Sequence, residues 1–307
     1  MSATDAKHTG RSLRLFLVDG SPTGLMIAEI VNWTGKAVVV PRAALAEFLA
    51  RPEAKATGVY LLAGPDPDDP FRPIVYVGEA EEVGIRLRTH DKDENKDFFE
   101  RAIVFVSKDE NLTKAHARFL EARVAERLRA SGRSKTINGV EPGGAGLPEA
   151  DREDMDYYLA QMELMLPALG LDVLRPMPST APDARASEVS PEFAYAGGGF
   201  DAKMQEIDGE FVLKTGSLVR GNETPTCPQG VRQQRETARQ DGALIRAEDG
   251  ANFRVTRDLT FSSPSGVGAF VYGGSVNGRL YWRITGTQTT YAEWRETQLA
   301  QTAAGAP

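Results

Sequence analysis

Two short apolar segments, separated by a break rich in proline and aspartate, constrain the fold of this chain more than any other feature. The first begins with Gly-Val-Tyr at residues 58–60, and the second ends with Tyr-Val-Gly at residues 76–78. The break at residues 64–73 holds four prolines and three aspartates. Apolar runs bounded by such turn residues are typical of strands. We therefore expect two strands joined by a long turn.

The composition is that of a globular protein with room for more than one core. The chain has 307 residues, 41% hydrophobic and 26% charged, which suits about two domains. Residues 1–10 are polar, and no stretch approaches the ~20 apolar residues of a membrane span. Cys227 is the only cysteine, which excludes an internal disulfide and a thiolate metal cluster. We expect a cytoplasmic protein without a membrane partner.

The charge is distributed unevenly. The net charge of -7 argues against a broadly basic surface that grips long duplexes. Residues 84–135, however, carry thirteen Lys and Arg against nine Asp and Glu. A phosphate-bearing partner would bind this segment most readily, although ordinary solvated helix faces would give the same bias.

Changes in composition and periodicity divide the chain into four regions. They are a small N-terminal β/α unit at 11–57, a domain at 58–175, a linker at 176–199 and a separate C-terminal α+β domain at 200–300. The linker is recognised by its Pro, Ser, Ala and Gly content. In the last region Asp208-Gly209 predicts a hairpin turn, helices are expected over 231–239 and 263–272, and short strands around Leu244, Phe253 and Tyr281.

The domain at 58–175 shows a strand and three helices after its first two strands. We expect a helix over 81–91, a third strand over 102–106, and helices over 113–130 and 151–166. The second of these helices has one buried face and ends before Gly132. Glu121 falls beside that face, so its carboxylate can emerge at the edge of the core.

The ordered set of polar and aromatic residues in this domain resembles the GIY-YIG endonuclease family. The resemblance covers about a third of the chain and rests on the two tripeptides with Arg86, His90, Glu121 and Asn138. It implies an α+β fold with a three-stranded antiparallel sheet flanked by helices. It also implies cleavage of phosphodiesters with one divalent metal, Mg²⁺ or Mn²⁺.

Phosphodiester hydrolysis explains why these residue types occur together. It needs an activated water and neutralisation of charge on the phosphate oxygens. Glu121 is a hard oxygen ligand that suits Mg²⁺, which keeps most of its waters. Arg86 offers a planar charged fork to a phosphate, and Arg88 on the same helix is a second nucleic-acid contact.

The resemblance assigns the remaining roles. Tyr76 is the candidate general base, which requires positive charge nearby to stabilise its phenolate. Tyr60 would position the water or phosphate, and His90 would share the proton transfer or hydrogen-bond the phosphate. Asn138 completes the catalytic set. Taken singly, the tyrosines are equally explained as strand aromatics, Arg86 as a surface charge and Asn138 as a turn residue.

Two residues depart from the family pattern. Glu79 stands where many members carry a basic or polar residue, and Ala80 replaces a threonine or serine. A negative charge at this position opposes ionisation of Tyr76 and repels phosphate. Catalysis weaker than that of typical members is therefore one expectation.

The C-terminal domain resembles an uncharacterised domain that is often fused to such nucleases. The resemblance rests on residues 261–265, the glycine-rich residues 273–278 and Trp282. More loosely, these segments resemble modules associated with restriction enzymes and adenine methylases. Candidate nucleic-acid contacts in this domain are the arginines Arg232, Arg235, Arg239 and Arg279.

The sequence therefore predicts a metal-dependent endonuclease acting on DNA, with the C-terminal domain used for targeting. The alternative is a GIY-YIG scaffold that has lost turnover and binds nucleic-acid structures or modifications. RNA stays open as the substrate, because phosphodiester chemistry is common to both polymers.

Overall fold

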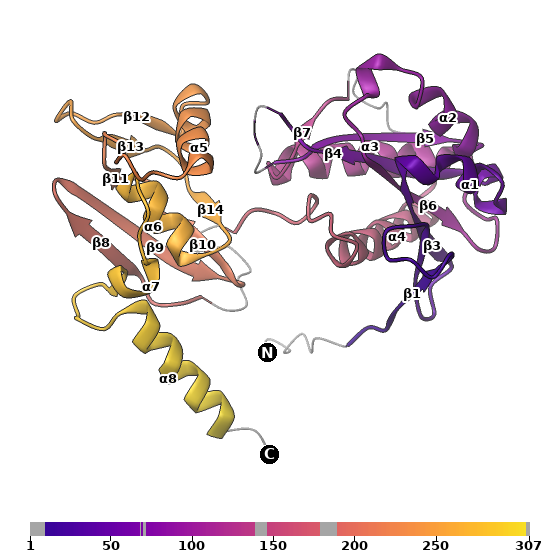
Figure 1. Cartoon of the computed structure of the whole chain (residues 1–307). Coiled ribbons are helices and arrows are strands. Elements are labelled where there is room, and N and C mark those ends of the chain that lie inside the picture. The colour runs from indigo at the N-terminus through magenta and orange to yellow at the C-terminus, as the bar shows by residue number, and fades with distance from the viewer. Residues whose placement is uncertain (1–9, 68, 70–71, 139–145, 179–188, 305–307) are drawn as a thin grey trace. The chain divides into compact units, whose positions relative to one another are not determined.

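The chain forms two compact units, residues 1–176 and 177–307 (Figure 1). The computed structural model describes residues 10–67, 69, 72–138, 146–178 and 189–304. The boundary falls at the start of the predicted linker, whose residues 179–188 lie outside the described ones. Both units combine a sheet with helices, so the expected α+β class is confirmed. None of the helices in the described residues has the length and apolar character to cross a membrane.

Unit 1 is built on a seven-stranded sheet in the order β1-β2-β3-β6-β4-β5-β7. Its strands are β1 (Leu13–Leu17), β2 (Met26–Ile30), β3 (Gly35–Pro41), β4 (Gly58–Gly64), β5 (Ile74–Ala80), β6 (Arg101–Ser107) and β7 (Lys135–Thr136). Neighbouring strands are antiparallel except β5 and β7, which are parallel. The three strands that the sequence predicts, β4, β5 and β6, lie side by side in this sheet.

The sheet is wider than the three strands that the sequence predicts. β3 pairs with β6 from Gly35 to Pro41, and β1 and β2 continue the sheet beyond it. Residues 13–41 therefore extend this sheet instead of forming a sheet of their own. The apolar residues of β3 account for this arrangement, because Val38 and Val40 pack into one core and Ala37 and Val39 into the other.

Helices cover both faces of this sheet. The α-helices are α1 (Leu45–Leu49), α2 (Val83–His90), α3 (Lys114–Ser131) and α4 (Glu149–Ala168), and the 3-10 helices are η1 (Arg42–Ala44), η2 (Pro52–Lys55) and η3 (Glu94–Lys96). Alternate residues of β4 enter different cores, as strand geometry requires. Tyr60 packs with Leu87 of α2, and Leu61 packs in the cluster that contains Leu120 of α3.

The ends of α3 follow from its sequence. The Thr113 hydroxyl accepts a hydrogen bond from the His116 amide at 3.3 Å, which begins the helix. Gly132 ends it with φ of 64°, a left-handed conformation that glycine adopts without strain. Glu121 lies within α3, between these two ends.

Unit 2 is built on a second sheet of eight strands. Its main order is β12-β13-β11-β9-β10-β14, and β8 pairs with both β9 and β15. The strands are β8 (Phe193–Gly197), β9 (Phe200–Ile207), β10 (Glu210–Leu213), β11 (Leu218–Val219), β12 (Leu244–Arg246), β13 (Phe253–Val255), β14 (Leu259–Phe261) and β15 (Arg283–Ile284). β8 falls within the predicted linker, so the end of that segment is part of the sheet.

The helices of unit 2 are α5 (Gln229–Gln240), α6 (Pro264–Tyr272), α7 (Gly278–Tyr281) and α8 (Tyr291–Ala304). The predicted hairpin turn is confirmed, because Asp208 and Gly209 have φ of 49° and 80°. The strand expected around Tyr281 is wrong: Tyr281 ends α7, and the strand begins at Arg283.

Candidate functional site

The residues singled out in the two tripeptides meet beside α2. The Tyr60 hydroxyl lies 2.8 Å from Nε2 of His90. The ring centroids of Tyr76 and His90 are 5.3 Å apart, and those of Tyr60 and Tyr76 are 6.4 Å apart. Tyr60 is opposite Gly78 in the β4–β5 register, and a Cβ at Gly78 would collide with the Tyr60 hydroxyl. Glycine at position 78 therefore makes room for the tyrosine of the first strand.

Arg86 reaches this cluster from the exposed side of α2. The buried neighbours Val83 and Leu87 fix the helix against the sheet, which leaves Arg86 facing away from the core. The Tyr60 hydroxyl, as a hydrogen-bond partner, is the largest cause of the raised pKa of Arg86, and Tyr76 contributes in the same way. A permanently charged guanidinium therefore lies against both tyrosines. Arg88 is exposed on the same helix.

Tyr60 and His90 are buried beneath this guanidinium. Tyr60 is 0% and His90 4% exposed. Burial raises the pKa of Tyr60, as do the charges of Tyr76 and Glu121, whereas Arg86 opposes the shift. Burial and then the charges of Arg86 and Lys96 lower the pKa of His90 to about 4.

Both groups are therefore neutral at pH 7, so the hydrogen bond between the Tyr60 hydroxyl and Nε2 of His90 joins two neutral side chains. The sequence predicted direct contact of Tyr60 with water or phosphate, and proton transfer by His90. Both side chains are buried, and their contacts are with each other and with Tyr76 and Arg86.

Glu121 lies at the edge of the α3 face, close to Glu79. Burial is the largest cause that raises the pKa of Glu121 to about 7, and the charge of Glu79 is the next. Arg118, Arg86 and the backbone amide of Glu79 lower it. From the sequence, Glu79 is expected to act on Tyr76. In the structure, alternation along β5 directs Glu79 to the same face as Val75 and Val77, which is the α3 side, so its charge acts on Glu121.

Lys96 is a further member of the cluster, and sequence reasoning missed it. It ends η3, and its Nζ lies 3.5 Å from the centroid of the Tyr76 ring. Burial lowers the pKa of Lys96, as does the charge of Arg86, whereas Asp93 raises it. A lysine in a short irregular segment follows no periodic pattern, so only its position shortly after His90 could have drawn attention to it.

Asn138 holds the edge of β5. Its Nδ2 donates to the Val77 carbonyl at 2.7 Å, and its Oδ1 accepts from the Val77 amide at 3.2 Å. Both ends of the side-chain amide therefore continue the pairing that β7 begins. The catalytic role implied by the resemblance requires a substrate contact, whereas these bonds give Asn138 a positioning role next to Tyr76 and Gly78.

Few side chains at this site could bind a metal ion. Among the described residues, no group of three His, Cys, Asp or Glu side chains lies close enough to hold a metal ion. Glu121 and Glu79 are two neighbouring carboxylates whose mutual repulsion a divalent cation would relieve. This set suits Mg²⁺ or Mn²⁺, because Mg²⁺ binds through one or two carboxylates and takes its other ligands from water and phosphate.

The four arginines predicted as nucleic-acid contacts in unit 2 differ in their surroundings. Arg235 is fully buried and donates to the carbonyls of Phe270 and Arg220. It is a structural residue, and the prediction that it contacts nucleic acid is wrong. Arg232 donates to the carbonyl of Cys227, and Arg239 pairs with Glu236 at 2.9 Å.

Arg279 is exposed on α7. Burial of Arg235 could not be read from the sequence, because arginine is among the residues least often buried. α5, the helix that carries Arg235, has few apolar residues to mark a buried face.

Comparisons with known proteins identify only part of unit 2. Residues 193–295 match the model of a family described as a domain of unknown function (DUF4357). The expected uncharacterised C-terminal domain is thereby confirmed, over about a third of the chain. No curated protein and no solved structure matches this chain.

Proposed function

We propose that unit 1 is a metal-dependent endonuclease that hydrolyses phosphodiester bonds in DNA. One observation carries the proposal: Arg86 interacts with Tyr60 and Tyr76, within electrostatic reach of a carboxylate whose pKa is raised. A fixed cation, a phenol and a carboxyl together are the groups that phosphoryl chemistry needs. The resemblance to the GIY-YIG family supports the same assignment.

Each group has a distinct task in this proposal. Arg86 binds a non-bridging phosphate oxygen through its planar fork, while the buried Tyr60 and His90 hold the fork in place. In its phenolate form Tyr76 accepts a proton from the attacking water and becomes the neutral phenol, with the cations of Lys96 and Arg86 beside it. Glu121, with Glu79 beside it, would hold the divalent ion. When bound, that ion neutralises charge on the phosphate.

Unit 2 has the role of a targeting domain in this proposal. The support is that it is a separate compact unit with its own core. A second unit that binds the substrate raises the local concentration of DNA at unit 1 without new contacts there.

One observation favours the alternative of a binding protein without turnover. The neighbouring Glu79 helps to raise the pKa of Glu121 to about 7, so this carboxyl is half protonated at neutral pH and a poorer metal ligand. A scaffold of this kind would bind nucleic acid through Arg86 and unit 2 and would not cleave it.

One experiment separates the two functions. Purified protein is incubated at pH 8 with Mg²⁺ or Mn²⁺ and with supercoiled, single-stranded, branched and modified DNA, and with RNA. Glu121→Ala and Arg86→Ala are assayed beside it, and Arg88→Ala serves as a control for loss of charge on α2. Cleavage abolished by the first two variants alone supports the enzyme. Binding without cleavage under either metal contradicts it and supports the scaffold.

A further inference from the structure

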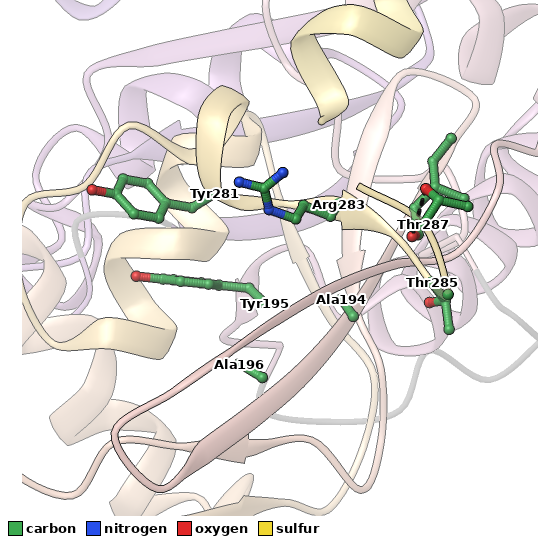
Figure 2. Close-up of a pocket in the computed structure, with 9 residues that line it drawn as sticks. Ala194, Tyr195, Ala196, Tyr281, Arg283, Thr285 and Thr287 are labelled. Atoms are coloured by element: carbon green, nitrogen blue, oxygen red, sulfur yellow. Dashed lines mark hydrogen bonds between the residues drawn. The ribbon is translucent and has the colours of Figure 1, made fainter. Parts of the chain in front are cut away.

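Unit 2 contains a cleft of about 290 Å³ beside β8. It is lined by Ala194, Tyr195 and Ala196 of this strand and by Tyr281 together with residues 283–287. Figure 2 shows the rings of Tyr195 and Tyr281 projecting in the same direction, with the side chain of Arg283 beside them. The volume lies near the lower end of the roughly 300–1,000 Å³ usual for ligand pockets, so it suits a single ring system.

A buried tryptophan positions two of these side chains. Trp282 is 0% exposed, and its indole Nε1 donates to the Pro264 carbonyl at 3.0 Å. Trp282 has an extended backbone with φ of -71° and ψ of 125°. Tyr281 at the end of α7 and Arg283 at the start of β15 flank this buried residue. Both are exposed.

Small residues leave space beneath Arg283. Arg283 is opposite Ala194 in the β15–β8 register, so the two lie on one face of the sheet, and Ala196 follows on that face. Phe193 and Tyr195 alternate with these alanines and belong to the hydrophobic core, although Tyr195 also borders the cleft. The alanines thus form a floor without long side chains. Larger residues at these two positions would fill the cleft.

One aromatic face is available to a ligand. Tyr281 carries a large ring, yet it is 52% exposed, whereas the next residue, Trp282, is buried. Its centroid lies 5.5 Å from that of Tyr195, which is 8% exposed and packs at 5.6 Å from Trp282. The buried ring therefore supports the exposed one, and stacking on Tyr281 requires little reordering.

The free charge of the cleft is positive. The Arg283 guanidinium donates one hydrogen bond to the Gln288 carbonyl at 2.6 Å. It forms no ion pair in the part of the chain that the structure describes. Among the acids around it, Glu293 accepts hydrogen bonds from Thr290 and also interacts electrostatically with Arg283, and Glu192 pairs with Lys203 at 3.1 Å and Lys214 at 3.0 Å. A cationic ligand is disfavoured here, whereas an anionic group beside the ring finds unused donors.

We infer that this cleft binds one nucleobase of a single-stranded nucleic acid, with the base stacked on Tyr281 and a phosphate on Arg283. An aromatic face next to an arginine is the combination that single-strand binding uses, because every base has a π face and carries a phosphate. A free nucleotide has the same chemistry and is distinguished below. The inference rests on the proposed targeting role of unit 2 and not on cleavage by unit 1.

The test measures binding by the full chain carrying Glu121→Gln, with EDTA present so that no cleavage occurs. Fluorescence anisotropy compares a labelled 12-nucleotide single strand with an abasic strand of equal length and with a duplex. We expect the single strand to bind most tightly, with Tyr281→Ala weakening it about tenfold and Tyr281→Phe, which keeps the ring, leaving it within about twofold. Arg283→Gln weakens binding severalfold, whereas Arg257→Gln, which removes an exposed charge outside the cleft, changes it little.

Three results would overturn the inference: equal binding of the abasic strand, no effect of Tyr281→Ala, or equal losses from Arg257→Gln and Arg283→Gln. Competition by adenosine monophosphate at the same concentration as the strand would retain the base-and-phosphate site but replace the strand by a free nucleotide. Thermal unfolding confirms that each variant is folded. If the wild type cleaves DNA with metal while Tyr281→Ala binds normally, the inference fails and the proposed function stands.

Discussion

Both units place an arginine beside two tyrosines, yet the surroundings of the two arginines differ. Arg86 lies against Tyr60 and Tyr76, with groups nearby whose pKa values are strongly shifted, His90 and Glu121. Arg283 lies beside exposed Tyr281 over a floor of alanines. The first arrangement suits proton transfer and charge neutralisation, and the second suits stacking and phosphate contact. Under the two proposals, similar residue types would serve different functions because their burial and neighbouring charges differ.

Substituting the tyrosines of unit 1 gives the largest expected effect. Tyr76 is partly exposed and Tyr60 fully buried, so only Tyr76 can take a proton from water. Tyr76→Phe should lower kcat roughly 100- to 10,000-fold, as loss of a general base does. Tyr60→Phe should lower it roughly tenfold through looser positioning of Arg86. Single-turnover cleavage measures both, and equal losses would contradict the division of roles.

Arginine geometry can be tested on α2 itself. Arg86→Lys keeps the charge but loses the planar fork, so kcat/KM should fall roughly 100-fold. Arg88→Lys, at the other exposed arginine of this helix, is the matched control and should change kcat/KM less than about twofold. A loss of similar size from both variants would mean that charge alone matters at this surface.

The buried arginine of unit 2 is expected to affect stability and not binding. Arg235→Ala leaves the carbonyls of Phe270 and Arg220 without donors, which should cost about 3 kcal/mol. Arg279→Ala, at an exposed position, should stay within about 0.5 kcal/mol of wild type. Urea unfolding of unit 2 monitored by tryptophan fluorescence measures both. An unchanged midpoint for Arg235→Ala would refute the structural role.

The pairing of Glu79 with Glu121 predicts a small shift in pH dependence. Metal binding needs the Glu121 carboxylate, so cleavage should rise with pH through about 7. Glu79→Gln removes one cause of the raised pKa and should move this rise down by ~0.5–1 pH unit. The conservative Glu81→Gln is the control, because Glu81 pairs with Lys114.

The raised pKa of Glu121 also determines how the stability of the fold depends on pH. The folded protein holds the Glu121 proton more tightly than the unfolded chain does, so this carboxyl stabilises the fold at low pH. That contribution is lost as the pH rises through about 7, the opposite direction to cleavage. If the pH rate profile of Glu79→Gln superimposes on that of the wild type, Glu79 does not raise the pKa of Glu121.

Local patterns predicted much of unit 1. The apolar runs located β4 and β5, and Thr113 and Gly132 marked the ends of α3. The pairing of β3 with β6 was missed because it joins segments far apart in sequence, which no local period records. The site residues Tyr60, Tyr76, Arg86 and His90 were predicted from their order, and the structure brings them together.

What the sequence could not give was the burial of each side chain. Tyr60 and Tyr76 stand in equivalent tripeptides, yet one is enclosed and the other reaches the surface. Lys96 was missed and Arg235 was assigned the wrong role for the same reason, since the environment of a charged side chain depends on contacts made by distant segments. Their roles became visible only with the tertiary structure.

The most direct test of the central claim is the metal dependence of plasmid cleavage at pH 8, where the Glu121 carboxyl is ionised. Supercoiled DNA is incubated with wild type and with Glu121→Gln over a range of Mn²⁺ and Mg²⁺ concentrations. The account predicts metal-dependent nicking by the wild type and none by the variant, with DNA binding unchanged between them. Equal nicking by both proteins, or none by either at any metal concentration, would contradict a metal-dependent nuclease site at Glu121.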